Sequence, residues 1–255
     1  MILHHRLDGP GDAPVVVLGP SVGTGIELWD PVLPQLAERW RVLRYDLPGH
    51  GGSPTPAEGF TVENIAGALA GLLDALEIRQ AAHAGVSMGG AVGTALALNA
   101  PDRVGALVLI CTSPRFGPPE QWWERAELVR REGVGPVAAM AAQRWFAPGF
   151  TGGGPYLRML RATDPEGYAA CCDALALFDA TARLPEISAP TLVIAGAADA
   201  ATPPEGHADR LAAGIPGAEL TVVEGAGHLA VAERPGPVAA AITAHLDRTW
   251  KGSPR

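Results

Sequence analysis

The stretch that decides the fold reads Gly85-Val86-Ser87-Met88-Gly89, with a further glycine at position 90. Residues 81–84 before it form a short apolar run, and residues 91–100 after it are rich in Ala and Leu. This pattern predicts a strand, a sharp turn and a helix, with Ser87 strained and exposed at the turn. The glycines let the helix approach the strand closely. Taken alone, the pentapeptide also fits a glycine-rich turn without catalytic function.

Two polar residues follow predicted strands in the second half of the chain. Residues 190–195 are a continuous apolar run typical of a buried parallel strand, and Asp199 lies in the loop behind it. A helix is expected over residues 205–213 and a strand over 219–223. His228 ends the glycine-rich loop that follows. The order Ser, Asp, His along the chain is the order of the triad in α/β-hydrolases.

Chemistry assigns a role to each of the three. His228 would take the proton of the Ser87 hydroxyl during attack, and Asp199 would hold the imidazole tautomer and stabilise the imidazolium. Considered singly, Asp199 could cap a loop and His228 could be a surface histidine. The histidines at positions 4, 5, 50, 83, 207 and 245 lack this placement, and the loop around His50 is interpreted as structural.

An oxyanion hole needs two backbone N–H groups. Met88 follows the nucleophile at the start of a helix, where free N–H groups favour negative charge. The second donor should come from the loop at residues 19–25, after the strand at 15–18, and Val22 is our candidate. Pro20 is excluded because proline has no N–H. The alternative is a plain glycine-rich turn.

The remaining pattern predicts an α/β fold with a mostly parallel sheet and helices on both faces. Strands are expected at residues 3–7, 15–18, 42–45, 81–84, 107–111, 190–195 and 219–223. Between positions 114 and 185 the sequence favours only helices, near 120–131, 135–145, 156–162 and 165–177. We therefore expect a core of residues 1–113 and 186–255, with residues 114–185 inserted as a helical cap over the active site.

Composition limits the function classes. A chain of 255 residues with 47% hydrophobic residues suits one sizeable α/β domain. The net charge of −8 argues against nucleic acid and anionic membrane surfaces as partners. We expect a cytoplasmic protein, because there is no spanning stretch or signal-peptide pattern and three cysteines do not form a disulfide framework. No metal and no cofactor are expected, and a homo-oligomer remains possible.

Longer motifs add a family resemblance. They are residues 41–52 (RVLRYDLPGHGG), 85–90 (GVSMGG), 144–150 (RWFAPGF), 165–172 (PEGYAACC) and 190–204 (PTLVIAGAADAATPP). With these the whole chain resembles the α/β-hydrolase superfamily and, within it, the 3-oxoadipate enol-lactonases of the β-ketoadipate pathway of aromatic compound catabolism. Two positions depart from that pattern: Pro20 stands where those enzymes usually carry Asn, and Pro48 where Arg is frequent.

The resemblance implies a serine esterase that opens a small, carboxylate-bearing enol-lactone to 3-oxoadipate through an acyl-enzyme. Arg144 would then bind the substrate carboxylate, because arginine pairs with carboxylates bidentately. Its alternative is a solvated arginine on a helix face. Trp122 and Trp145 could line the pocket, or could simply pack within the cap.

Three other functions stay open at this point. Another hydrolase with the same triad, such as a carboxylesterase, a carbon–carbon bond hydrolase or a perhydrolase, would share every core motif. A biosynthetic lyase or cyclase could reuse the serine turn without an acyl-enzyme. A non-catalytic ligand-binding protein on this fold would not need all three triad residues.

Overall fold

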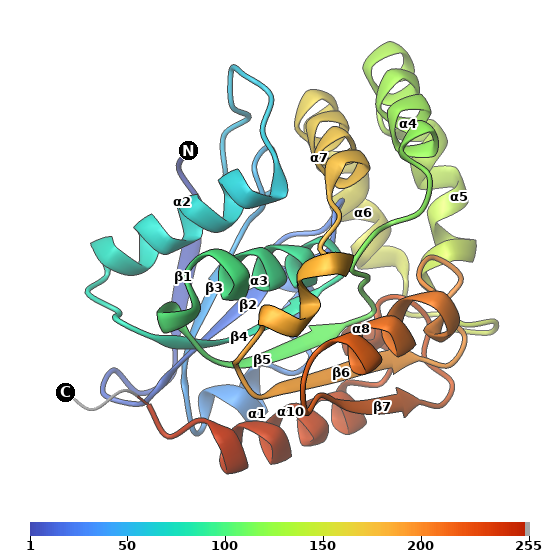
Figure 1. Cartoon of the computed structure of the whole chain (residues 1–255). Coiled ribbons are helices and arrows are strands. Elements are labelled where there is room, and N and C mark those ends of the chain that lie inside the picture. The colour runs from blue at the N-terminus through green and yellow to red at the C-terminus, as the bar shows by residue number, and fades with distance from the viewer. Residues whose placement is uncertain (253–255) are drawn as a thin grey trace.

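The computed structural model describes residues 1–252, and in them one seven-stranded sheet has the order β1-β3-β2-β4-β5-β6-β7 (Figure 1). β1 is antiparallel to β3, and every other neighbouring pair is parallel. This confirms the predicted α/β class. The strands are β1 (His5–Asp8), β2 (Val15–Gly19), β3 (Arg41–Tyr45), β4 (Ala81–Val86), β5 (Val104–Ile110), β6 (Thr191–Gly196) and β7 (Glu219–Val223).

Helices cover both faces of this sheet. One face carries α1 (Leu33–Ala37) and α10 (Pro235–Thr249), and the other carries α2 (Val62–Ala75), α3 (Met88–Asn99) and α8 (Asp209–Gly214). Because β2, β4 and β6 lie between these layers, all of their residues are buried. The short helices are η1 (Ile26–Trp29), η2 (Pro101–Arg103), η3 (Thr181–Glu186), η4 (Pro204–Ala208) and α9 (Ala230–Glu233).

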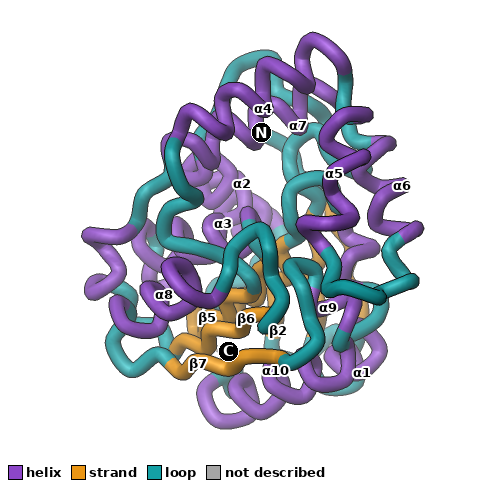
Figure 2. The backbone as a smooth tube through the Cα atoms, turned by 90° about the vertical axis from the view of Figure 1, so that its right-hand side faces the viewer, coloured by secondary structure: helices purple, strands orange, loops and turns teal. Residues whose placement is uncertain are grey.

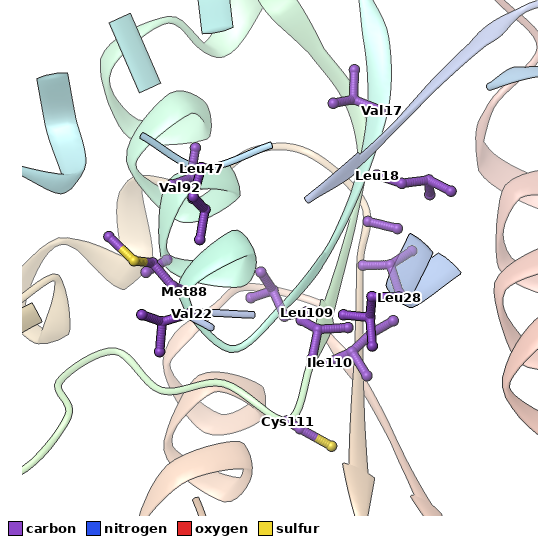
Figure 3. Close-up of a cluster of buried hydrophobic side chains, with 14 of the residues drawn as sticks. Val17, Leu18, Val22, Leu28, Leu47, Met88, Val92, Leu109, Ile110 and Cys111 are labelled. Carbon is purple, nitrogen blue, oxygen red and sulfur yellow. The ribbon is translucent and has the colours of Figure 1, made fainter. Parts of the chain in front are cut away.

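The chain order of the sheet explains where a site can form. β2 and β4 are neighbours and parallel, with Gly19 opposite Gly85, so the loops that follow them leave the same edge side by side. Ligands of open parallel sheets bind at such strand ends. Figure 3 shows Val22, from the loop after β2, and Met88, the first residue of α3, in one buried cluster with Leu18 and Ile110.

Four helices separate β5 from β6: α4 (Pro119–Glu132), α5 (Gly135–Trp145), α6 (Gly154–Ala162) and α7 (Pro165–Leu177). Figure 2 shows them gathered on one side of the molecule, beyond the strands. α4 packs mainly against α7 and also against α5. The four helices lie where the sequence predicts helices, while the division of the chain at residues 114 and 185 stays a prediction.

Two local predictions need correction. The expected helix at 205–213 is broken: Glu205 is extended and Gly206 has a φ of 84°, so a regular helix begins only at Asp209. Pro203 is extended and Pro204 begins η4, because proline fixes φ and suits the start of a helix. Gly206 then adopts the left-handed conformation, which interrupts the helix. The strand expected at 107–111 ends at Ile110, because Cys111 turns to a φ of 45°.

No helix in the described part of the chain is long and apolar enough to cross a membrane.

Candidate active site

Ser87 sits at a strained turn between β4 and α3. Its φ of 54° and ψ of −114° are unusual for a residue with a side chain. The neighbouring strand fixes this conformation, because Ser87 N–H donates to Ile110 O over 2.9 Å and Thr112 Oγ1 donates to Ser87 O over 2.6 Å. A Cβ on Gly85 would collide with the backbone of Gly89, so the turn requires glycine there.

Asp199 and His228 come together behind β6 and β7. His228 Nδ1 donates to Asp199 Oδ2 over 2.9 Å, and both side chains are buried. Thr202 Oγ1 also donates to Oδ2, over 2.8 Å, while the N–H groups of Ala201 and Thr202 donate to Oδ1. Burial acts to raise the pKa of Asp199, but His228 and the Thr202 hydrogen bonds outweigh it and leave the pKa lowered. Asp199 is therefore a carboxylate at neutral pH. Because its hydrogen bond holds the proton on His228 Nδ1, the other ring nitrogen, Nε2, can act as a base.

Ser87 and His228 line one cavity of about 170 Å³. Among the described residues no hydrogen bond joins their side chains. Catalytic hydrogen bonds are often loose without substrate and shorten when it binds. The sequence-predicted trio is thus assembled at one place, with Asp199 behind His228 and both reactive side chains on the cavity wall.

The two candidate oxyanion donors flank Ser87. Val22 lines the cavity, and Met88 is the first residue of α3. Neither N–H donates a hydrogen bond within the described residues. Their backbones are held together, since Gly89 N–H donates to Pro20 O over 3.0 Å. This close approach of the two loops leaves both N–H groups free for a ligand.

Arginines form the most distinctive part of the cavity wall. Arg144 lines it, as the sequence suggested, and so does Arg125 of α4, which sequence reasoning did not select. The Arg125 guanidinium stacks over Trp122, 4.5 Å from the ring centroid. No carboxylate of the described residues forms an ion pair with either arginine. Partial burial, and then the charge of Arg125, lower the pKa of Arg144, although arginine stays protonated.

The predicted tryptophans both reach the cavity. Trp145 is buried, and Trp122 is half-buried, with its Nε1 donating to Phe116 O over 2.7 Å. His207 also lines the cavity, although sequence reasoning did not select it as a site residue. The broken helix at Glu205–Gly206 turns it inward, a feature that helical periodicity could not reveal.

Comparison with known proteins places this geometry in context. Residues 15–241 match the Alpha/beta hydrolase family. The 3-oxoadipate enol-lactonase 2 of Acinetobacter baylyi is 38% identical over 205 residues, which are 78% of this chain and 77% of that protein. The putative carbamate hydrolase RutD of Stutzerimonas stutzeri is 33% identical over 239 residues, 89% of either chain.

Solved structures of related hydrolases have the same fold. The enol-lactonase from Burkholderia xenovorans LB400 superposes with a TM-score of 0.92 at 37% identity, covering 96% of both chains. A hydrolase from Pseudomonas aeruginosa PA01 also gives a TM-score of 0.92, at 40% identity over 96% of this chain and 94% of that one. The core and the helices between β5 and β6 are therefore arranged as in these enzymes.

Proposed function

Because this chain belongs to the alpha/beta hydrolase family and is a hydrolase, we propose that it opens a small enol-lactone bearing a carboxylate, such as 3-oxoadipate enol-lactone. One observation carries the proposal: the cavity that holds Ser87 and His228 also holds Arg125 and Arg144 without acidic partners. Two unpaired cations beside a nucleophile favour an anionic substrate, since arginine binds carboxylates through paired hydrogen bonds.

The chemistry follows from the geometry. Ser87 Oγ attacks the lactone carbonyl while His228 Nε2 takes its proton, and Asp199 stabilises the imidazolium. The N–H groups of Val22 and Met88 receive the oxyanion. Collapse breaks the ring C–O bond, His228 returns the proton to the enol oxygen, and an acyl-enzyme remains. Water then attacks the acyl carbon with His228 as base, and His228 returns that proton to Ser87 Oγ as the acyl bond breaks. The enol of the released acid tautomerises to the ketone, which gives 3-oxoadipate.

The test measures hydrolysis of 3-oxoadipate enol-lactone by the purified protein, with p-nitrophenyl acetate as a neutral ester. We expect lactone turnover much faster than ester cleavage, and loss of both activities in Ser87→Ala. Ester cleavage without lactone turnover would reject the substrate while keeping a serine esterase. Lactone turnover that survives in Ser87→Ala would reject the nucleophile.

A second experiment tests the arginines. Arg125→Gln and Arg144→Gln should each raise KM for the anionic lactone about tenfold, since a hydrogen bond to a charged group contributes about 1.5–3 kcal/mol. Both variants should leave ester cleavage within about twofold by the same reasoning. Arg161→Gln, at an exposed cap position outside the cavity, is the matched control. An unchanged KM in both cavity variants would contradict carboxylate binding there.

A further inference from the structure

A second hollow adjoins the candidate active site on the outside of the molecule. It measures about 560 Å³ and lies between the loop that leads into α4 and the broken helix η4. Gly117 and His207 belong to the walls of both spaces. The hollow therefore adjoins the cavity of Ser87, and these two residues stand where the two spaces meet.

The junction is held in a defined shape. Ser113 Oγ donates to Arg115 O over 2.6 Å, so its lone pair accepts from His207 Nδ1–H at 2.8 Å. This bond fixes the His207 ring between the two spaces. Gly117 and Gly206 both have φ near 85°, and a Cβ on either would meet no atom within 4 Å. Turn geometry, rather than crowding, accounts for glycine on the two sides of the opening.

The charges of the outer hollow differ from those of the whole chain. Its wall includes Arg115, Arg210 and one acidic residue, Glu120. The side chain of Arg210 has no ion pair among the described residues, and Arg115 reaches Asp179 only at 3.8 Å. The chain as a whole carries a net charge of −8, which repels an anion. Cations at an opening offset this repulsion locally and raise the encounter rate.

We propose that this outer hollow is the entrance for the substrate, and that Arg210 and Arg115 draw an anionic ester or lactone towards the junction at His207. The inference rests on the proposed hydrolase function and deepens it, because it assigns the route to Ser87. It makes two independent statements: the entrance selects by charge, and its width is set at position 207.

Charge reversal tests the first statement. Arg210→Glu and the control Arg79→Glu change the net charge equally. Arg79 is exposed and lines neither of the two spaces. We compare kcat/KM for mono-p-nitrophenyl succinate, an anionic ester, with that for p-nitrophenyl acetate. Arg210→Glu should lower kcat/KM for the anionic ester about fourfold at low salt. The substitution changes the local charge by two units, and each unit acts on the substrate charge across about 10 Å of water. Added salt at about 0.5 M should remove the difference in kcat/KM between Arg210→Glu and the parent on the anionic ester.

Three results would overturn charge selection: an equal loss for the neutral ester, an equal loss in Arg79→Glu, or no salt dependence. Activity of the parent protein on the two esters reports separately on the proposed function. A parent inactive on both esters and on 3-oxoadipate enol-lactone would reject the proposed function itself, whereas an active parent with equal ratios in both variants would reject only the entrance.

Obstruction tests the second statement. His207→Trp should slow labelling of Ser87 by a bulky fluorophosphonate at least tenfold, while His207→Ala labels at the parental rate or faster. Circular dichroism of both variants is the control for folding, and both should give the parental spectrum. Parental labelling in folded His207→Trp would place the entrance elsewhere, and equal slowing in His207→Ala would assign the histidine a different role.

Discussion

His50 Nε2 accepts a hydrogen bond from the N–H of Gly23 over 2.9 Å, joining the loop after β3 to the loop that carries Val22. The imidazole is neutral, because burial lowers its pKa to about 4, and its Nδ1–H donates to Pro48 O. The His50 loop therefore has a definite structural role: it fixes the backbone next to Val22, a candidate oxyanion donor.

Replacing this histidine should affect catalysis more than binding. His50→Leu leaves Gly23 N–H buried without an acceptor, which costs about 1–3 kcal/mol of unfolding free energy. We expect kcat to fall about tenfold with little change in KM, because complete loss of an oxyanion donor costs about 10²–10³. Steady-state kinetics on p-nitrophenyl acetate measure both constants. His5→Leu on β1 is the control, and a rise in KM alone would contradict this role.

The hydroxyl of Thr202 should matter for the orientation of the candidate triad. It donates to Asp199 Oδ2 at 2.8 Å and lies 3.3 Å from His228 Nδ1. Thr202→Val keeps the shape of the side chain and removes this donor, so kcat/KM should fall about tenfold, the equivalent of one charge-assisted hydrogen bond. Thr202→Ser retains the hydroxyl and should stay within about threefold by the same argument. Equal losses in the two variants would indicate packing instead.

Two glycines should respond oppositely to alanine. Gly85→Ala pushes a Cβ into the backbone of Gly89 and should reduce the unfolding free energy by about 3 kcal/mol or more. Gly67→Ala, on the exposed side of α2 with no atom near its Cβ, should increase it by about 0.5–1 kcal/mol. Urea unfolding of both variants measures the difference. A neutral Gly85→Ala would show that the turn at Ser87 is looser than its contacts indicate.

The response to acid should depend on His83. Its ring is buried in β4 without a hydrogen-bond partner among the described residues, and burial lowers its pKa to about 3. The unfolded chain binds this proton near pH 6.5, so between pH 6.5 and 3 unfolding takes up a proton. Stability therefore falls with decreasing pH, by about 1.4 kcal/mol per unit from this group.

His83→Leu removes that contribution. Below pH 6 the unfolding free energy of the variant should fall less steeply than that of the parent, and the two slopes should differ by about 1.4 kcal/mol per pH unit. At pH 7 the variant should be more stable than the parent by about 1 kcal/mol. Denaturant unfolding at pH 7, 6 and 5 gives the slopes. Identical slopes for parent and variant would mean that the buried ring is protonated in both the folded and the unfolded state, or in neither.

Sequence reasoning succeeds where one local pattern carries the information. The motif around Ser87 predicts its strand, turn and helix, and the strands predicted before Asp199 and His228 are present in the structure. These features depend on neighbours within a few positions. Helix boundaries fail at Glu205, because a proline pair and a glycine together set a backbone that neither predicts alone.

Two residues that line the cavity escaped prediction for a different reason. Arg125 occupies an ordinary position on an amphipathic helix, and only the placement of α4 turns it towards Ser87. His207 reaches the same space because a loop from another strand contributes Ser113 as its partner. Contacts between segments about a hundred positions apart leave no periodic trace in one sequence.

The two unpaired guanidiniums stand on α4 and α5, whereas Ser87, Asp199 and His228 stand on loops of the sheet. Under the proposed function, acylation and charge preference therefore depend on separate segments of the chain. These segments also contact each other directly, since Leu229 N–H donates to Trp145 O and Ala147 N–H donates to the Glu233 carboxylate. A chimaera that receives the four helices of an esterase for neutral substrates should keep the acylation chemistry and lose the proposed preference for anionic substrates.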